Sequence, residues 1–309
     1  MRNALLVVFV LGCGTEPTEP GQPVSIVDAG VTLGDDAGPA PVDAGPPPGC
    51  DQDGDGYLAT DCAGGTDCDD RDRSRHPDSP ERCSFVDENC SGVNNEGLDC
   101  TFYAHGRYDL YRIDPFKERV LPAGTLRTPE RRGVLDIDSA PDGTLIGVTR
   151  EELLSFDDQG RYELIASIDT PRNTNGLAID STGRIFLTQS DDEGSQAYTV
   201  TQRGDIDVLG DLSPYQSSGD CVVLKDDSLL MTAPSEYGDL LVYVDSRDAT
   251  PRVLGATGFE KIYGLSASFG YLFGVTDEGR ILLIDANTGE ASELFRRADL
   301  RFWGAANGD

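Results

Sequence analysis

Three aspartates at alternate positions form the most chemically informative stretch of this chain: Asp51, Asp53 and Asp55. The glycines between and after them permit a tight bend, so the three carboxylates can turn toward one point. Calcium takes about six to eight hard oxygen ligands, and this loop, with the backbone carbonyl of Tyr57, supplies about half of them. We expect the other half from the acidic run that follows the loop: Asp67, Asp69, Asp70 and Asp72.

Other metals fit this stretch less well than Ca2+. An EF-hand loop that starts at Asp51 would carry a bidentate Glu at its twelfth position, which here is Cys62, so a helix-flanked EF-hand is disfavoured. Copper and other transition metals need imidazole or sulfur, and residues 50–100 contain one histidine, His76. Zinc held by four thiolates is disfavoured because no Cys-x-x-Cys pair occurs. An acidic surface cluster without metal is the remaining alternative, and the sequence favours Ca2+.

Several acidic and cysteine motifs follow one another in residues 50–100. In chain order they are Asp51-x-Asp53-Gly54-Asp55-Gly56-Tyr57, Asp67-Cys68-Asp69-Asp70, Pro77-x-x-x-Glu81-x-Cys83, Asp87-Glu88-Asn89-Cys90-Ser91-Gly92 and Asn95-Glu96-Gly97. In this order they resemble the MopE-type metal-binding repeat of bacterial surface proteins. The usual second half of that repeat has acids where this chain has Ser91 and Asn95. The resemblance therefore implies a second, weaker metal position with Asp87, Asn89, Ser91, Asn95 and Glu96.

Six of the eight cysteines fall in residues 50–100, which contain few large apolar side chains. Such a short segment cannot build a sufficient core, and disulfides with bound ions are the usual remedy. Six cysteines allow fifteen pairings. The short spacings favour Cys62 with Cys68 and Cys83 with Cys90, which leaves Cys50 and Cys100 to close the module, and the other pairings remain open.

The first 49 residues have the composition of an export signal followed by a linker. Residues 1–13 contain Arg2, an apolar run and Gly12-Cys13, which resembles the lipobox of bacterial lipoproteins. The resemblance implies acylation of Cys13 and anchoring of the protein to the outer membrane. Residues 14–49 are rich in Pro, Gly, Asp and Ala and lack aromatic residues, so we expect a disordered tether.

The charge of the chain excludes one class of partner. The formal net charge is −30, from 55 acidic and 25 basic residues. Because no basic stripe is available to neutralise phosphates, we expect no binding to nucleic acid.

Residues 101–309 contain a repeat of apolar, strand-like runs that each meet an Asp- or Gly-containing turn. Successive runs end at Ile113, Phe156, Val200, Val244 and Ile284, so the steps are 43, 44, 44 and 40 residues. Four short runs in each period of this length are typical of a β-propeller, here with five blades. The run after Phe302 would supply the innermost strand of the blade that starts at Phe102, so both ends would close the ring. The fold class is therefore all-β, and the repeats resemble the generic propellers of the NHL or lactonase-like kind.

In such a ring the segments that lead into the innermost strands crowd one mouth of the central channel. The residues predicted there for ligand binding are Arg132, Asn175, Asp220, Tyr263 and Trp303. Aromatic rings with polar side chains suit a glycan, a peptide or a protein ligand. Lactonase-like or glycosidase-like hydrolysis, with a metal or a carboxylate pair in the channel, is the alternative. Since only Asp220 and Glu260 are candidate channel acids, the sequence favours binding over catalysis.

Overall fold

A computed structural model describes residues 49–129, 132–157, 159–168, 174–191, 194–201 and 204–308. The signal segment with Cys13, and the tether up to residue 48, lie outside the described residues. Within the described residues, no helix has the length and apolar character needed to cross a membrane.

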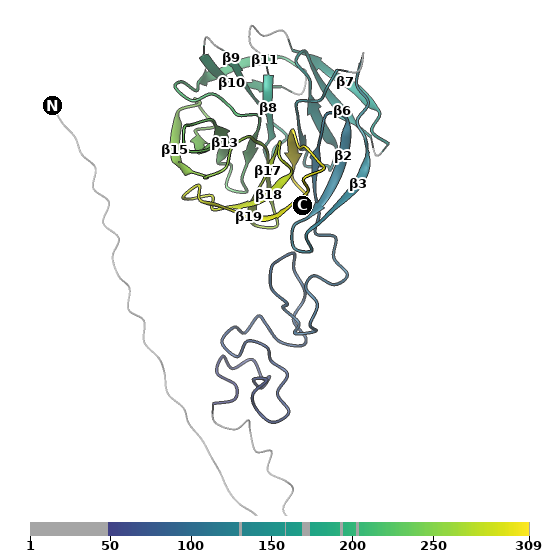
Figure 1. The fold of residues 1–309 in the computed structure, drawn as a ribbon, viewed down its shortest axis with the longest axis vertical. Coiled ribbons are helices and arrows are strands. Elements are labelled where there is room, and N and C mark those ends of the chain that lie inside the picture. Colours follow the sequence, from purple (N-terminus) through teal and green to yellow (C-terminus); the bar gives the residue numbers. More distant parts are fainter. Residues whose placement is uncertain are drawn as a thin grey trace, which may run out of the picture. The chain divides into compact units, whose positions relative to one another are not determined.

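Five antiparallel four-stranded sheets form the blades of a propeller (Figure 1). From the innermost strand outward, the first blade contains β20 (Gly304–Ala306), β1 (Phe102–His105), β2 (Asp109–Asp114) and β3 (Arg119–Thr125). The second contains β4 (Asp136–Ser139), β5 (Leu145–Val148), β6 (Glu152–Phe156) and β7 (Tyr162–Ser167). The third contains β8 (Thr174–Ile179), β9 (Ile185–Asp191), β10 (Gly194–Val200) and β11 (Ile206–Asp211). The fourth contains β12 (Cys221–Val223), β13 (Leu229–Ala233), β14 (Leu240–Val244) and β15 (Pro251–Ala256). The fifth contains β16 (Ile262–Ser268), β17 (Tyr271–Thr276), β18 (Arg280–Ile284) and β19 (Ala291–Arg296).

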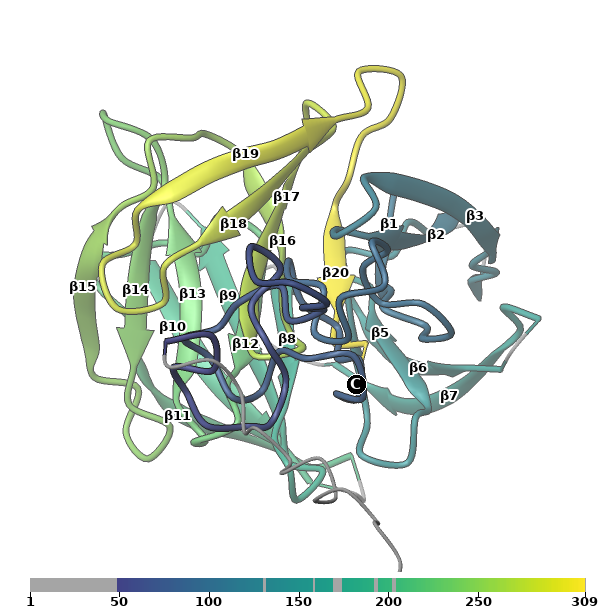
Figure 2. The same cartoon turned by 90° about the horizontal axis from the view of Figure 1, so that it is seen from below.

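The two ends of the repeat region close the ring, as the sequence predicts. Strand β20 pairs antiparallel with β1, with Tyr103 opposite Ala306 and His105 opposite Gly304. The five innermost strands follow one another around the centre in the order β4, β8, β12, β16 and β20. Figure 2 labels four of them, β8, β12, β16 and β20. Pairing with β20 covers the inner edge of β1, which would otherwise be open to pairing with another chain.

Apolar side chains between neighbouring blades hold the ring together. The inner strands β13 and β17 are almost completely buried, whereas the outermost strands β11 and β19 have only half-buried and exposed positions. At the closure, Phe102 of β1 stacks on Phe273 of β17, with ring centroids 5.2 Å apart, and both are fully buried. Because each repeat presents apolar residues on both faces of its sheet, stacking the blades in a ring is what removes them from water.

Residues 50–100 form a module with little regular secondary structure, stabilised by three disulfides. The bonds are Cys50–Cys62, Cys68–Cys90 and Cys83–Cys100. All six cysteines are therefore oxidised as expected, but the pairings favoured by short spacing are wrong. The cause is the path of the backbone: the N–H of Ala59 donates to the carbonyl of Cys50 at 2.9 Å, which brings the Cys62 turn back to the start of the module.

The module contacts both blades that meet at the ring closure. The Phe85 ring lies edge-on to Phe116, in the turn after β2, and to Tyr271 at the start of β17, with centroids 4.8 and 5.3 Å apart. The ammonium of Lys117 donates to the backbone carbonyl of Asn95 at 3.1 Å. These contacts link the module to the first and fifth blades.

Candidate metal centre and channel mouth

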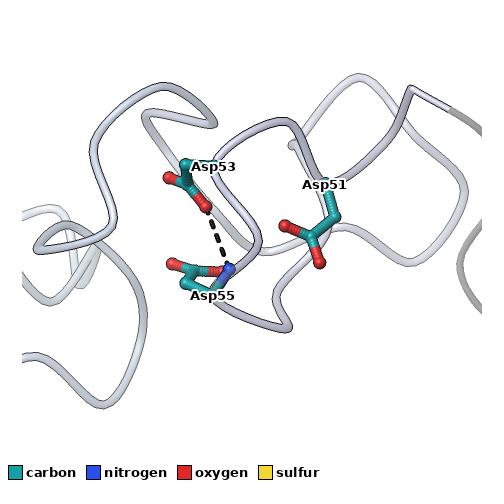
Figure 3. A group of neighbouring side chains, drawn as sticks. All are labelled: Asp51, Asp53 and Asp55. Carbon is teal, nitrogen blue, oxygen red and sulfur yellow. Dashed lines mark hydrogen bonds between the residues drawn. The ribbon is translucent and has the colours of Figure 1, made fainter. Parts of the chain in front are cut away.

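The loop of residues 51–55 is folded by its own carboxylates. The Oδ1 atoms of Asp51, Asp53 and Asp55 accept hydrogen bonds from backbone N–H groups of residues 54, 55 and 57, at 2.7, 3.1 and 2.8 Å. Gly54 and Gly56 adopt φ angles of 75° and 98°, which side chains disfavour. As a result, the three carboxylates each offer a ligand atom within 4.8 Å of the others (Figure 3).

Of the four acidic residues expected to complete the site, Asp67 and Asp70 belong to segments that are joined to this loop. The Oδ1 atom of Asp70 accepts a hydrogen bond from the N–H of Gln52 at 2.9 Å, and the parallel bridge of Ala59 with Asp67 joins the two segments. Both carboxylates are buried, with Asp67 1% and Asp70 9% exposed. Two stretches of sequence therefore bring acidic side chains into one region.

Four carboxylate oxygens of this region are buried and have no hydrogen-bond partner among the described residues: the Oδ2 atoms of Asp53, Asp55, Asp67 and Asp70. Burial raises the pKa of Asp53, and the neighbouring charges of Asp55, Asp67 and Asp51 raise it further. Buried anionic oxygens without donors are costly unless a cation neutralises them. The donor set consists of hard oxygens alone, which fits Ca2+.

Two of the predicted ligands are engaged elsewhere. Asp69 forms an ion pair with Arg75, with Oδ2 and Nη1 2.5 Å apart. The Oδ1 atom of Asp72 accepts hydrogen bonds from the N–H and the hydroxyl of Ser74, at 3.1 and 2.6 Å. The Tyr57 side chain stacks on His76, with centroids 4.6 Å apart, while the role of its backbone carbonyl stays a prediction. Asp51, Asp53 and Asp55 thus form one group of possible ligands. Asp70 is joined to this loop through Gln52, and Asp67 through its bridge with Ala59, whereas Asp69 and Asp72 are held by Arg75 and Ser74.

The second predicted position is largely a hydrogen-bonded framework. Both oxygens of Asp87 accept backbone N–H groups, from Ser91 at 3.1 Å and Gly92 at 2.7 Å. The Oε1 atom of Glu96 accepts from the hydroxyl of Ser91 at 2.6 Å and from Nδ2 of Asn89 at 2.8 Å. These two donors lower the pKa of Glu96, whose Oε2 atom is buried without a partner among the described residues.

Asn95 takes part in this framework from the inside. Its side chain is fully buried, accepts the N–H of Ser84 at 3.0 Å and donates to the carbonyl of Ser84 at 3.0 Å. An amide can donate and accept at once, which a carboxylate at this position could not do. Asn95, which stands where the MopE-type repeat has an acid, therefore stabilises the fold of the module through its side-chain amide.

At the start of the innermost strands the channel opens in a small pocket of about 170 Å³. Its lining includes three of the predicted residues, Asn175, Tyr263 and Trp303, together with Leu135, Ser218 and Gly219. Arg132 instead lines a neighbouring pocket of about 490 Å³ that shares Trp303 and Leu135 with the first. The two pockets thus form one composite mouth, with Trp303 at the boundary between them.

Asp220 does not line the mouth, which corrects the sequence prediction. Since β12 begins at Cys221, Gly219 takes the position at the rim and Asp220 lies one residue deeper, fully buried. The free Cys221 beside it is also buried. The register of the innermost strand therefore decides which residue lines the opening.

Sequence reasoning missed the partner of Asp220 on the channel axis. Asp136 on β4 is fully buried, and its Oδ2 atom accepts the N–H of Leu177 on β8 at 2.7 Å. Asp220 likewise accepts the N–H of Leu265 on β16. Burial raises the pKa of both carboxyls well above the usual range. The pKa of Asp136 is raised further by the charge of Asp220 and by a hydrogen bond with that carboxyl. The signal was present in the sequence, because Asp136 occupies in its repeat the position that Asp220 occupies in a later one.

Two more buried titratable groups lie near this pair. Asp138 accepts the N–H of Ile179 at 2.8 Å, and burial raises its pKa to about 7. The Nδ1 atom of His105 lies 2.6 Å from the carbonyl oxygen of Gly106, so this nitrogen carries the proton. Burial lowers the pKa of His105 to about 4, so the ring is neutral near pH 7. The channel interior is therefore a closed polar layer that joins blades through side chain to backbone hydrogen bonds.

Comparison with known proteins agrees with the two-part organisation. Residues 67–96 match the family model Cu-binding_MopE, which is described as "Putative metal-binding motif". The described part of the chain thus carries this motif directly before a five-bladed propeller. No curated protein matches the chain.

Several solved structures are similar to the propeller. TolB from Acinetobacter baumannii is 17% identical with a TM-score of 0.44, and the match covers 63% of this chain and 52% of TolB, so the chain spans about half the length of that protein. A gluconolactonase from Xanthomonas campestris is 14% identical, with 63% and 77% covered and a TM-score of 0.44. Virginiamycin B lyase from Staphylococcus aureus is 14% identical, with 70% and 77% covered and a TM-score of 0.42. These are similarities of fold.

Proposed function

We propose that residues 50–100 bind a structural Ca2+ ion through the loop of residues 51–55 together with Asp67 and Asp70. The observation that carries the proposal is the group of four buried carboxylate oxygens without donors. An ion there would join the two segments, offset their mutual repulsion and stiffen the module. Extracellular calcium modules bind with dissociation constants of about 10⁻⁴ to 10⁻³ M, which suits a structural role better than sensing.

The chemistry of the module argues against a soft metal at this place. All six cysteines are in disulfides, so they offer no thiolate. His76 stacks on Tyr57, and its Nδ1 atom accepts the N–H of Asp78 at 3.3 Å. Copper prefers imidazole or sulfur ligands, whereas the unpartnered atoms here are carboxylate oxygens. Ca2+ therefore remains the preferred ion.

Calcium titration of the full chain tests this proposal. At about 100 times the dissociation constant, one bound ion adds about 2.7 kcal/mol to the free energy of unfolding. We expect Ca2+ to raise the melting temperature of the wild type but much less that of Asp53→Asn or Asp67→Asn. Asp61→Asn is the matched control because it removes the same charge from an exposed position of the module. Equal calcium responses in all three variants would contradict the site.

We further propose that the protein is a lipid-anchored lipoprotein of the outer membrane, with the propeller as a module for binding a glycan, a peptide or a protein. The lipobox-like Gly12-Cys13 and the linker composition of residues 14–49 support the anchor. Three disulfides support an oxidising compartment outside the cytoplasm. Metabolic labelling with palmitate tests the anchor: the label should be lost in Cys13→Ala, and retention of label would refute acylation at this residue.

A hydrolase with a carboxylate pair in the channel is the second candidate, and Asp136 with Asp220 is the observation that favours it. Both carboxyls are fully buried and accept strand N–H groups, so a binding role agrees better with the geometry. Assays on lactones and glycosides distinguish the two. Turnover that disappears in a folded Asp220→Asn variant would favour the hydrolase, and binding without turnover would favour the module.

A further inference from the structure

The larger of the two pockets at the channel mouth is basic, although the chain as a whole has a net charge of −30. Its charged lining residues are Arg107, Arg132, Arg150 and Glu151. Arg132 forms an ion pair with Glu151, so Arg107 and Arg150 supply the surplus positive charge. A local basic pocket in an acidic protein selects for a small anionic group, because the surrounding surface repels large polyanions.

Backbone contacts place these arginines beside the only tryptophan of the chain. The N–H of Trp303 donates to the carbonyl of His105 at 2.8 Å, which fixes the tryptophan next to the turn that carries Arg107. Gly133 lies between the two, since a Cβ atom at this position would be 3.4 Å from the Trp303 ring and 3.6 Å from the Arg107 side chain. Arg150 occupies the corresponding turn of the next blade, between β5 and β6.

The other side of Trp303 faces the smaller pocket, whose lining includes Tyr263, Ser218 and Asn175. Asn175 is held in place, because its Nδ2 atom donates to the carbonyl of Ser217 at 2.8 Å. The composite mouth therefore offers two aromatic rings and polar groups on one side and two surplus guanidinium groups on the other. Aromatic faces suit the apolar face of a sugar ring, and guanidinium forks suit a carboxylate.

The mouth lies at the end of the propeller away from the module. Strand β1 leaves the module at Phe102 and reaches the mouth at His105, which is paired with Gly304 next to Trp303. The contacts of the module, through Phe85, are with turns and strand starts at the opposite ends of the strands. A ligand at the mouth would therefore not compete with the module for space.

We propose that this mouth binds an acidic carbohydrate, with a uronate ring against Trp303 and its carboxylate between Arg107 and Arg150. The inference rests on the proposed binding role of the propeller and names its ligand class. Trp303 is the only tryptophan, so its fluorescence reports on the site directly. Trigalacturonate is the probe, and the same trisaccharide with its carboxyl groups reduced to alcohols is its neutral counterpart.

Trigalacturonate should shift the fluorescence of the full chain and bind at least about tenfold more tightly than the neutral counterpart at low salt, since ion pairs with the guanidinium groups require the carboxylate. The double variant Arg107→Gln with Arg150→Gln should lose most of this preference. Trp303→Phe, followed by calorimetry, should weaken both sugars. Arg247→Gln is the matched control, because Arg247 is exposed and paired with Asp245 in the turn after β14, far along the chain from the mouth.

Four other results of these binding experiments would contradict part or all of the proposal. Equal binding of the two sugars would overturn the acidic ligand class and leave the binding role of the propeller standing. Binding of neither sugar, or of a carboxylate-ended peptide alone, would overturn the carbohydrate proposal. A glycan and peptide array without any binder would in addition count against the binding role itself. Unchanged preference in the folded double variant would show that Arg107 and Arg150 do not hold the carboxylate.

Discussion

Replacement of Asp138 by Asn should change how the stability of the propeller depends on pH. Asp138 is 2% exposed on the innermost strand β4. Its oxygens accept the N–H groups of Ser139 and Ile179, both at 2.8 Å, and of Asn307 at 3.3 Å. Burial outweighs these hydrogen bonds and raises the pKa of this carboxyl from 3.8 to about 7.

The sign follows from the number of protons that each state binds. Between pH 3.8 and about 7 the folded protein keeps the Asp138 proton while the unfolded chain has lost it. The contribution of this group to stability is therefore complete below pH 3.8 and is lost as pH rises to about 7, with a slope of about 1.4 kcal/mol per pH unit. Over the full interval the loss is on the order of 4 kcal/mol. Asn does not titrate, so the variant lacks this contribution.

The substitution also has a cost that does not depend on pH. The Asn carbonyl can still accept the Ile179 N–H, but the amide NH2 would face the N–H of Ser139, which costs about 1 to 3 kcal/mol. The difference in unfolding free energy between wild type and Asp138→Asn should therefore be largest at low pH. It should shrink by about 1.4 kcal/mol for each pH unit up to neutrality.

Urea unfolding at constant calcium, at four pH values between about 4.5 and 7.5, measures this difference. Groups shared by both proteins, including Asp136 and Asp220, largely cancel in it. Asp142→Asn is the control, because hydrogen bonds from Thr144 lower the pKa of this exposed carboxyl and it stays ionised over this range. A difference between wild type and Asp138→Asn that stays constant across the range would refute the reasoning.

Three further changes test other parts of the structure. Cys68→Ala with Cys90→Ala opens a loop of 22 residues and should cost about 3 kcal/mol, measured by unfolding of the full chain against the oxidised wild type. Gly304→Ala should destabilise the ring by several kcal/mol because a Cβ atom there would overlap an axial carboxylate oxygen and the His105 ring. Gly183→Ala, which has open space at its turn, should cost only about 1 kcal/mol, and equal losses in the two would refute the clash. Phe85→Ala should increase hydrogen exchange in the module without lowering the melting temperature of the propeller by more than a few degrees.

The sequence by itself determined the number of blades, their closure and the acidic loop of residues 51–55. Each of these depends on short-range patterns: apolar runs and turn residues recur at a nearly constant interval, and Asp51, Asp53 and Asp55 alternate within one bend. The loop folds through hydrogen bonds that span two or three residues, so local spacing is sufficient to recognise it.

Only the tertiary structure decided which residues from distant segments meet. Spacing favoured Cys62 with Cys68, but backbone hydrogen bonds bring Cys62 to Cys50 and leave Cys68 for Cys90. At the channel, a difference of one residue in strand register places Gly219 in the lining of the mouth and Asp220 outside it. The surplus charge of Arg107 and Arg150 beside Trp303 comes from turns of neighbouring blades, which no local pattern connects. The spacing of apolar runs in the sequence determines the repeat. The register of the strands and the packing of neighbouring blades determine which side chains face one another.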